Sequence, residues 1–302
     1  MVRRPSPVDL MLTTTVVIWA FNITVTKYVL THGFRPLAYA SIRYGSAALL
    51  TAAIAFALEG SLAVRGRRTL SLIGLASLFL IVNQVSFVYA LKLGSATTVA
   101  LILGTTPIFA ALVSSLIGLE RLTGRFWAAA AIGFAGVALV ALGSGRNLSA
   151  DLGGDLLAIL LAISWACYSV TVAPLMRSYS PYRMSAVVLL VMCVPFVALS
   201  SPQIADQDYA SLSWLVWFCL AFAIAGPLTL TNVLWFTAIG RVGPSRATLF
   251  ANIQPFIAAI FAGLILSEHL HPLQIVGGVT ILAGIVLERR WRRPGVEAPL
   301  VE

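Results

Sequence analysis

Amide side chains lie inside long apolar runs of this 302-residue chain. In the stretch "FANIQPFIAAIF", Asn252 and Gln254 come just before Pro255. An unsatisfied polar group in hydrocarbon costs several kcal/mol, so both side chains must face protein or water. Proline cannot donate a helix hydrogen bond, and it disturbs the turn before it, which leaves carbonyl groups without partners. Polar side chains beside a disturbed helix are typical of a ligand site within a membrane, and hydrogen bonds that hold neighbouring helices together are the alternative.

The same arrangement occurs 148 positions earlier, where Thr106 precedes Pro107. At this constant offset, residues 93–122 and 241–270 share eight identities. Outside these two stretches, the same offset pairs other residues of the two halves, and nearer the start of each half the offset drifts to 146. The pairs include Pro107 with Pro255, Glu120 with Glu268, Gln84 with Asn232, Gly136 with Gly284 and, at the offset of 146, Trp19 with Trp165.

Aromatic and amide side chains in other apolar runs belong to the same predicted site. Trp165 and Tyr168 are spaced i, i+3, which places them on one face of a helix. Membrane tryptophans usually lie at the interface, but Trp19 and Trp165 are central in their runs. Central rings with amide groups suit a flat apolar substrate that carries a polar end, and packing is the alternative for each ring. The full predicted binding set is Trp19, Asn22, Arg43, Asn83, Gln84, Thr106, Trp165, Tyr168, Asn232, Trp235, Asn252 and Gln254, with Pro107 and Pro255 as helix-disrupting residues.

Two basic residues, Lys27 and Arg43, also fall inside apolar runs. A charge at the centre of a bilayer costs about 2.5–3.5 kcal/mol on insertion scales, but Lys27 is near the end of its run and Arg43 is seven residues past Pro36. One interpretation has both side chains reach the membrane surface. The functional interpretation makes Arg43 the attractor of a substrate carboxylate.

Composition places the chain in a membrane. Hydrophobic residues make up 59% of it, charged residues only 10%, and the mean hydropathy is +0.94. Soluble domains carry about 25% charged residues, so we expect an all-α integral membrane fold with the lipid bilayer as a partner. Since a bilayer core needs roughly 20 apolar residues per helix, the sequence predicts ten transmembrane helices. They cover about residues 8–30, 36–58, 69–91, 95–117, 126–144, 153–175, 182–200, 213–238, 244–266 and 272–288.

The basic residues are distributed unevenly across this predicted membrane. Of the 20 Lys and Arg residues, 15 fall on one side, and Arg35, Lys92 and Arg146 fall on the other. Because cytoplasmic loops are enriched in Lys and Arg, both termini are expected in the cytoplasm of a multi-pass plasma-membrane protein, in bacteria the inner membrane. The net charge of +9 is explained by this topology, and no nucleic acid is expected as a partner.

Each half of the chain, 1–148 and 149–302, holds five predicted helices. Since five is odd, the second half must enter the membrane in the opposite direction, and corresponding loops should differ in charge. The loop with Arg65 and Arg67 indeed corresponds to one with Asp206. Two inverted-topology five-helix repeats are the architecture of many secondary transporters, which alternate access to a central site.

Two stretches combine a Pro inside an apolar run, a Glu at the end of that run and a Gly-bearing last helix: "TTPIFAALVSSLIGLERLTGRFWAAAAIGFAGVAL" (105–139) and "IQPFIAAIFAGLILSEHLHPLQIVGGVTILAGIVL" (253–287). A third stretch, "WAFNITVTK" (19–27), precedes the first of them. In these stretches the chain resembles the drug/metabolite transporter superfamily, in the branch built from two EamA-type five-helix repeats. By overall likeness, it is most similar within this branch to bacterial exporters of aromatic and other neutral amino acids. The second half departs from the repeat at Cys167 and Tyr168, where the first half has Phe21 and Asn22.

Residues that are missing narrow the function further. No Asp or Glu lies near the centre of a predicted helix, so facilitated export or exchange is simpler than coupling through a buried carboxylate. There is no GxxxxGK[ST], HExxH or GxSxG motif, so we expect no enzyme, and neither a cofactor nor a metal.

We therefore predict a secondary transporter that exports small amphipathic metabolites by alternating access, with aromatic and other neutral amino acids favoured as the small-molecule substrate. The alternatives are an organic anion or sugar-phosphate exchanger of the same superfamily, and a non-transporting membrane scaffold. The oligomeric state stays open, and a monomer is compatible with the sequence.

Overall fold

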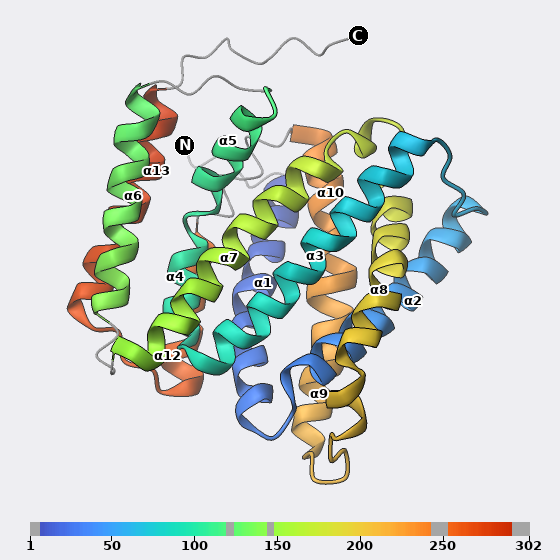
Figure 1. The fold of residues 1–302 in the computed structure, drawn as a ribbon, viewed down its shortest axis with the longest axis horizontal. Helices are drawn as coiled ribbons and strands as arrows, with labels where there is room; N and C mark the ends of the chain where they lie inside the picture. Colours follow the sequence, from blue (N-terminus) through green and yellow to red (C-terminus); the bar gives the residue numbers. More distant parts are fainter. Residues whose placement is uncertain (1–6, 119–123, 144–147, 243–252, 292–302) are drawn as a thin grey trace.

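The computed structural model describes residues 7–118, 124–143, 148–242 and 253–291, and the regular secondary structure in these ranges is helical (Figure 1). The first half contributes α1 (Pro7–Thr31), α2 (Pro36–Glu59), α3 (Arg67–Leu93), α4 (Ala96–Leu103), α5 (Thr106–Leu116) and α6 (Gly124–Leu142). The second half contributes α7 (Leu148–Val172), η1 (Leu175–Arg177), α8 (Pro181–Ala205), α9 (Trp214–Ala223), the π-helix η2 (Ile224–Leu230), α10 (Thr231–Val242), α12 (Gln254–Leu266) and α13 (Pro272–Trp291).

Within the described residues, six helices are long and apolar enough to cross a membrane. They are α1, α2, α3, α7, α8 and the continuous run from α9 through η2 into α10. The pair α4 and α5 forms a seventh candidate that is bent by 44°, and α6, α12 and α13 contain shorter apolar stretches. The predicted all-α membrane fold is thus confirmed, while the number of ten spans stays a prediction.

Short connections with defined ends set the helix boundaries. Pro36 and Pro181 are the first residues of α2 and α8, a position where the missing N–H of proline is not needed. Ser95, Ser180 and Ser213 precede helices, and each side chain accepts a hydrogen bond from the backbone N–H three residues further on. These caps satisfy donors that a helix start leaves open.

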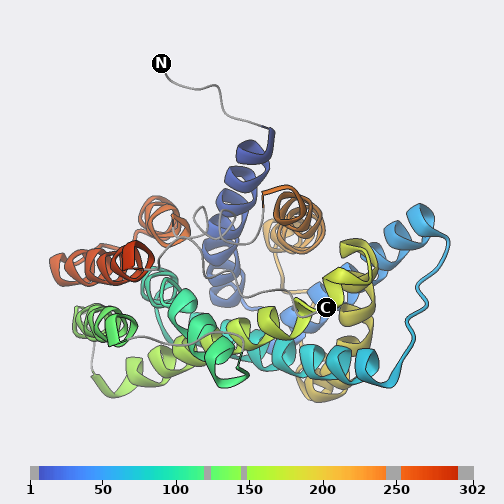
Figure 2. The ribbon, with the colours of Figure 1, turned by 90° about the horizontal axis from the view of Figure 1, so that it is seen from above.

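The two halves of the chain pack against each other throughout. The most extensive helix contacts are those of α6 with α13, α3 with α7, and α2 with α8. Figure 2 shows α6 and α13 at one end of the molecule, and α2 and α8 at the other. The contacts of α1 with α10 and α12 correspond to those of α7 with α3 and α5. Contacts that correspond when the halves are exchanged are expected of two related units packed about a two-fold axis.

Ion pairs at both ends of α2 and α8 show that these helices run antiparallel. Arg35, before α2, contacts Asp206, after α8, with 3.2 Å between Nη1 and Oδ2. Glu59, at the end of α2, contacts Arg183 near the start of α8, with 2.9 Å between Oε2 and Nη2. The side chains of Arg35 and Asp206 are 47% and 64% exposed, and those of Glu59 and Arg183 are 18% and 23% exposed, so the second pair is the less screened of the two.

Glycines let α6 and α13 approach backbone to backbone. A Cβ atom on Gly136 would lie 2.7 Å from the carbonyl oxygen of Gly277, and a Cβ atom on Gly277 would lie 2.7 Å from that of Gly136. Lipid gives membrane helices no hydrophobic reason to associate, so they gain van der Waals contact by placing small residues at the interface. This seam joins the first half to the second.

Interruptions of the helices occur in both halves. Gly104 and Thr105 separate α4 from α5, and Pro255 is the second residue of α12. The two positions meet, because a Cβ atom on Gly104 would lie 3.4 Å from Cγ of Pro255. The π-helix η2, which contains Pro227, interrupts a span that the sequence predicts as one helix.

Gly136→Ala is expected to lower the melting temperature in detergent, because the added methyl group meets backbone that cannot rotate aside. Overpacking of this kind costs about 1–3 kcal/mol. Gly74→Ala is the matched control, since Gly74 lies in α3 with no atom within 4 Å of its Cβ position. Equal melting temperatures for the two variants would contradict the close approach of α6 and α13.

Candidate binding site

Four aromatic side chains of the predicted set gather between α1, α7 and α10, and we call them the aromatic cluster. The ring centroid of Trp19 lies 6.2 Å from that of Trp165, edge to face, and 5.0 Å from that of Trp235. The rings of Trp165 and Tyr168 are 5.4 Å apart. All four side chains are half-buried. Aromatic pairs at such separations contribute about 0.5–1.5 kcal/mol each beyond their burial.

The π-helix of the second half orients a ring of the first half. Nε1 of Trp19 donates a hydrogen bond to Oγ1 of Thr231 at 2.7 Å and lies 3.4 Å from the carbonyl oxygen of Pro227. The hydroxyl of Thr231 donates to the same carbonyl. A π-bulge displaces carbonyl groups from the regular ladder, and such bulges are frequent at functional sites.

Arg43 is 2% exposed and heads a chain of hydrogen bonds. Its Nη2 donates to Oε1 of Gln84 at 2.8 Å, and its Nη1 lies 3.5 Å from Oγ1 of Thr26. Nε2 of Gln84 donates to Oδ1 of Asn83 at 2.7 Å, and Nδ2 of Asn83 donates to the carbonyl of Leu161 at 3.0 Å. These hydrogen bonds link α1, α2, α3 and α7. Because Arg43 is buried, its side chain does not reach the membrane surface.

Aromatic rings surround the guanidinium group of Arg43. Its Cζ lies 5.1 Å from the ring centre of Tyr44, 5.4 Å from that of Tyr39 and 5.6 Å from that of Phe87. Arg43 takes part in no ion pair among the residues that the structure describes, and its buried Nε has no hydrogen-bond partner there. A buried charge is costly unless it is paired, so this arrangement favours an anionic group of a ligand.

One stripe of α1 connects the aromatic cluster to Arg43. Trp19, Asn22 and Thr26 are spaced i, i+3, i+7, which places them on one face over about 10 Å of helix. Asn22 lies between the other two, is 8% exposed, and its Oδ1 has no partner within the described part of the chain. A buried amide oxygen without a donor is suited to accept a hydrogen bond from a ligand.

The predicted residues at the helix breaks make local contacts. Oγ1 of Thr106 donates to the carbonyl of Leu103 at 2.7 Å, and this is the carbonyl that a residue at position 107 would bond in a regular helix. The carbonyl that Pro107 leaves open therefore has a donor within its own chain. Gln254 begins α12 and is half-buried, whereas Asn252 lies outside the described residues.

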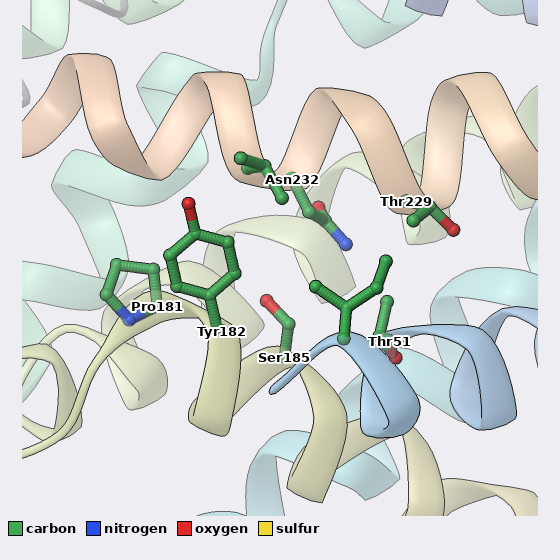
Figure 3. A pocket seen from close by; sticks show the side chains of 8 residues that line it. Thr51, Pro181, Tyr182, Ser185, Thr229 and Asn232 are labelled. Carbon is green, nitrogen blue, oxygen red and sulfur yellow. The ribbon is translucent and has the colours of Figure 1, made fainter. Parts of the chain in front are cut away.

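Asn232 lines a small cavity between α2, α8 and the end of η2 (Figure 3). Its side chain lies near those of Thr51 and Ser185, and its Nδ2 donates to the carbonyl of Leu228 at 2.7 Å. The cavity measures about 10 Å³, which is at the lower limit for one water molecule. Asn232 thus has no room for a larger ligand in this conformation.

Several residues of the site are absent from the predicted set. Tyr39 precedes Arg43 by four positions and Tyr44 follows it directly, so helix spacing carried a signal for Tyr39. Nothing in the sequence indicated the hydroxyl groups of Thr26 and Thr231, because their partners lie on other helices.

Two segments of the chain, residues 6–142 and 152–288, match the EamA-like transporter family. A "Probable amino-acid metabolite efflux pump" of Escherichia coli (strain K12) is 27% identical over 295 residues, which cover 92% of this chain and 94% of that protein. The "Uncharacterized transporter YyaM" of Bacillus subtilis (strain 168) is 24% identical over 271 residues, 88% of this chain and 87% of that protein. A solved structure described as "Crystal structure of protein" has a similar fold, with a TM-score of 0.64 at 20% identity, over 94% of this chain and 97% of the other.

Gln84→Leu is expected to destabilise the protein, because it removes the acceptor of a buried guanidinium group. Hydrogen bonds to charged groups contribute about 1.5–3 kcal/mol, so the melting temperature in detergent should fall by several degrees. The double variant Arg43→Leu/Gln84→Leu holds no buried cation and should melt above Gln84→Leu. Thr280→Val, at a half-buried position of α13 where the hydroxyl bonds a carbonyl of its own helix, is the control and should change stability by about 0.5 kcal/mol at most. Additive losses in the double variant would contradict direct coupling.

Proposed function

The chain belongs to the EamA-like transporter family, and from this premise we propose that it exports aromatic and other neutral amino acids by alternating access. It is a multi-pass membrane transporter. The names of its E. coli and Salmonella typhimurium relatives, both "Probable amino-acid metabolite efflux pump", support an amino-acid metabolite as cargo.

The proposed topology has ten spans in two inverted repeats, 1–148 and 149–302, with both termini in the cytoplasm. The excess of Lys and Arg on one side supports this orientation. The antiparallel course of α2 and α8, which occupy the same place in their halves, supports the inversion. The membrane is the plasma membrane, in bacteria the inner membrane.

The observation that carries the substrate assignment is the α1 stripe with Arg43 at one end and the aromatic cluster at the other. The carboxylate of an amino acid would bind Arg43, whose guanidinium group is buried without a carboxylate partner in the described residues. Its ammonium group would donate to Oδ1 of Asn22, and its apolar side chain would lie on the aromatic cluster. The residues at the helix breaks, Thr106, Asn252 and Gln254, complete the proposed site.

An organic anion or sugar-phosphate exchanger is the second candidate, because a buried guanidinium group also suits a phosphate. A phosphate carries more charge than a carboxylate, and Lys27 is the cation that would supply the balance. The Nζ of Lys27 donates instead to the carbonyls of Leu91 and Gly94 at 2.6 Å each. One guanidinium group without a carboxylate partner in the described residues favours a single carboxylate.

Exchange of labelled phenylalanine across proteoliposomes is the expected activity. Arg43→Gln should reduce it about 10–100-fold, because a hydrogen bond to a charged group contributes about 1.5–3 kcal/mol. Trp165→Ala should reduce it about 2–10-fold through loss of ring contacts. Trp214→Ala, which removes a tryptophan that is 77% exposed at the start of α9, is the matched control and should exchange normally.

Substrate analogues separate the candidates. Phenethylamine, which lacks the carboxylate, should not compete with phenylalanine, and 3-phenylpropionate should compete weakly because it lacks the ammonium group. If phosphate esters are exchanged and amino acids are not, the protein is the organic anion or sugar-phosphate exchanger instead. A protein that exchanges none of these compounds would refute the proposed cargo.

Reporters fused to the chain ends test the topology. Green fluorescent protein should fluoresce, and alkaline phosphatase should stay inactive, at both the amino and the carboxyl end, since both ends lie in the cytoplasm. Ends on opposite sides would rule out the inverted repeat.

A further inference from the structure

The turn between α3 and α4, which consists of Gly94 and Ser95, receives a positively charged side chain from α1. Nζ of Lys27 donates to the carbonyl oxygens of Leu91 and Gly94, at 2.6 Å each. Both carbonyls belong to the end of α3, where the last groups of a helix lack partners. A cation at this end is also favoured by the helix dipole.

The same turn receives a negatively charged side chain from the segment after α12. Oε1 of Glu268 accepts the backbone N–H of Ala96, and Oε2 accepts that of Thr97, both at 3.0 Å. These are the first N–H groups of α4, so the carboxylate caps the positive end of that helix. Nε2 of Gln274 adds a third contact, to Oγ1 of Thr98 at 3.1 Å.

The two charged residues reach the turn from α1 and from the segment after α12. Helix α7 packs on α3, α4 and α5, and α1 packs on α10 and α12, while α12 also packs on α4 and α1 on α3. The turn is in backbone contact with α7, because a Cβ atom on Gly154 of α7 would lie 3.0 Å from the backbone nitrogen of Gly94. Lys27 belongs to α1 and Glu268 follows α12. At the turn, contact with α7 is thus made by backbone atoms, and contact with Lys27 and Glu268 by charged side chains.

A polar cavity of about 290 Å³ adjoins these contacts. Its lining includes Ser95, Thr97, Glu268 and Gln274, and Oγ1 of Thr97 is buried without a partner in the described part of the chain. The cavity has room for several water molecules. Water can therefore replace each partner when the charged groups separate, which keeps the free-energy cost of their separation low.

We propose that Lys27 and Glu268 form a clasp on the turn at Gly94 and Ser95, which closes one mouth of the transporter and releases when that mouth opens. The proposal rests on the alternating-access function proposed above, in which this mouth is the outer one. Lys27 and Glu268 act as positioning residues, since they set the balance between the closed and open mouth without contacting substrate.

Labelling of a buried cysteine tests the clasp without any substrate. In a chain whose three cysteines are replaced by alanine, Thr24→Cys places a thiol on α1 near Lys27, at a position that is 0% exposed. Glu268→Gln and Lys27→Met should each raise the rate of labelling by an external, membrane-impermeant methanethiosulfonate about tenfold, the factor that corresponds to about 1.4 kcal/mol. Glu268→Asp, which keeps the charge, should return the rate toward that of the parent.

Asp206→Asn is the matched control, because it breaks an exposed ion pair between the ends of α2 and α8 and leaves the clasp intact. Its labelling rate should equal that of the parent. Labelling is measured below the melting temperature of each variant. A lower melting temperature without faster labelling would assign Lys27 and Glu268 a purely structural role and overturn the clasp.

A reversible tether gives a second readout. Thr97→Cys/Glu268→Cys, joined by a short bis-methanethiosulfonate, should block phenylalanine exchange, and a reducing agent should restore it. Exchange that continues through the tether would overturn the proposal. If the untethered protein exchanges no phenylalanine, the proposed cargo fails, while the labelling rates still decide whether the clasp exists.

Discussion

Polar groups inside a membrane protein must find partners within the protein, because lipid offers none. Many polar side chains in the described part of this chain have such partners. The hydroxyl of Thr106 bonds the carbonyl of Leu103, which precedes Pro107 by one turn. The indole of Trp19 bonds Thr231 at the end of a π-helix. Where the requirement is left partly unmet, at Arg43 and Asn22, a ligand has something to contribute.

Two kinds of contact between helices differ in how readily they can separate. Along α6 and α13 the backbones touch at Gly136 and Gly277, and no water-filled space adjoins that pair among the cavities described above. At the turn between α3 and α4 the contact is made by charged side chains beside a polar cavity. A close apolar seam resists opening, because its contacts are lost outright, while charged groups exchange their partners for water. Alternating access needs both kinds of contact.

The broken helices give the fold its central irregularity. The interruption at Gly104 meets Pro255 of the other half, and η2 interrupts the span formed by α9 and α10. Irregular backbone at membrane depth is tolerated only where it is buried in protein or lines a water-filled cavity. In this chain it supplies the carbonyl of Pro227 that helps to hold Trp19, and so contributes to the position of the aromatic cluster.

The sequence by itself determined the membrane fold, the starts of α2 and α8 at Pro36 and Pro181, the two related halves and the grouping of Trp19 with Trp165. Apolar runs, prolines and a repeated pattern are local signals, and the physical requirement for apolar surface in lipid fixes their meaning. Only the tertiary structure decided what each polar side chain contacts. It placed Arg43 against Gln84 and Asn232 in a cavity too small for a ligand. It also brought Glu268 to an N–H group 172 positions away, because side-chain partners depend on how distant helices are rotated and packed, which no local pattern records.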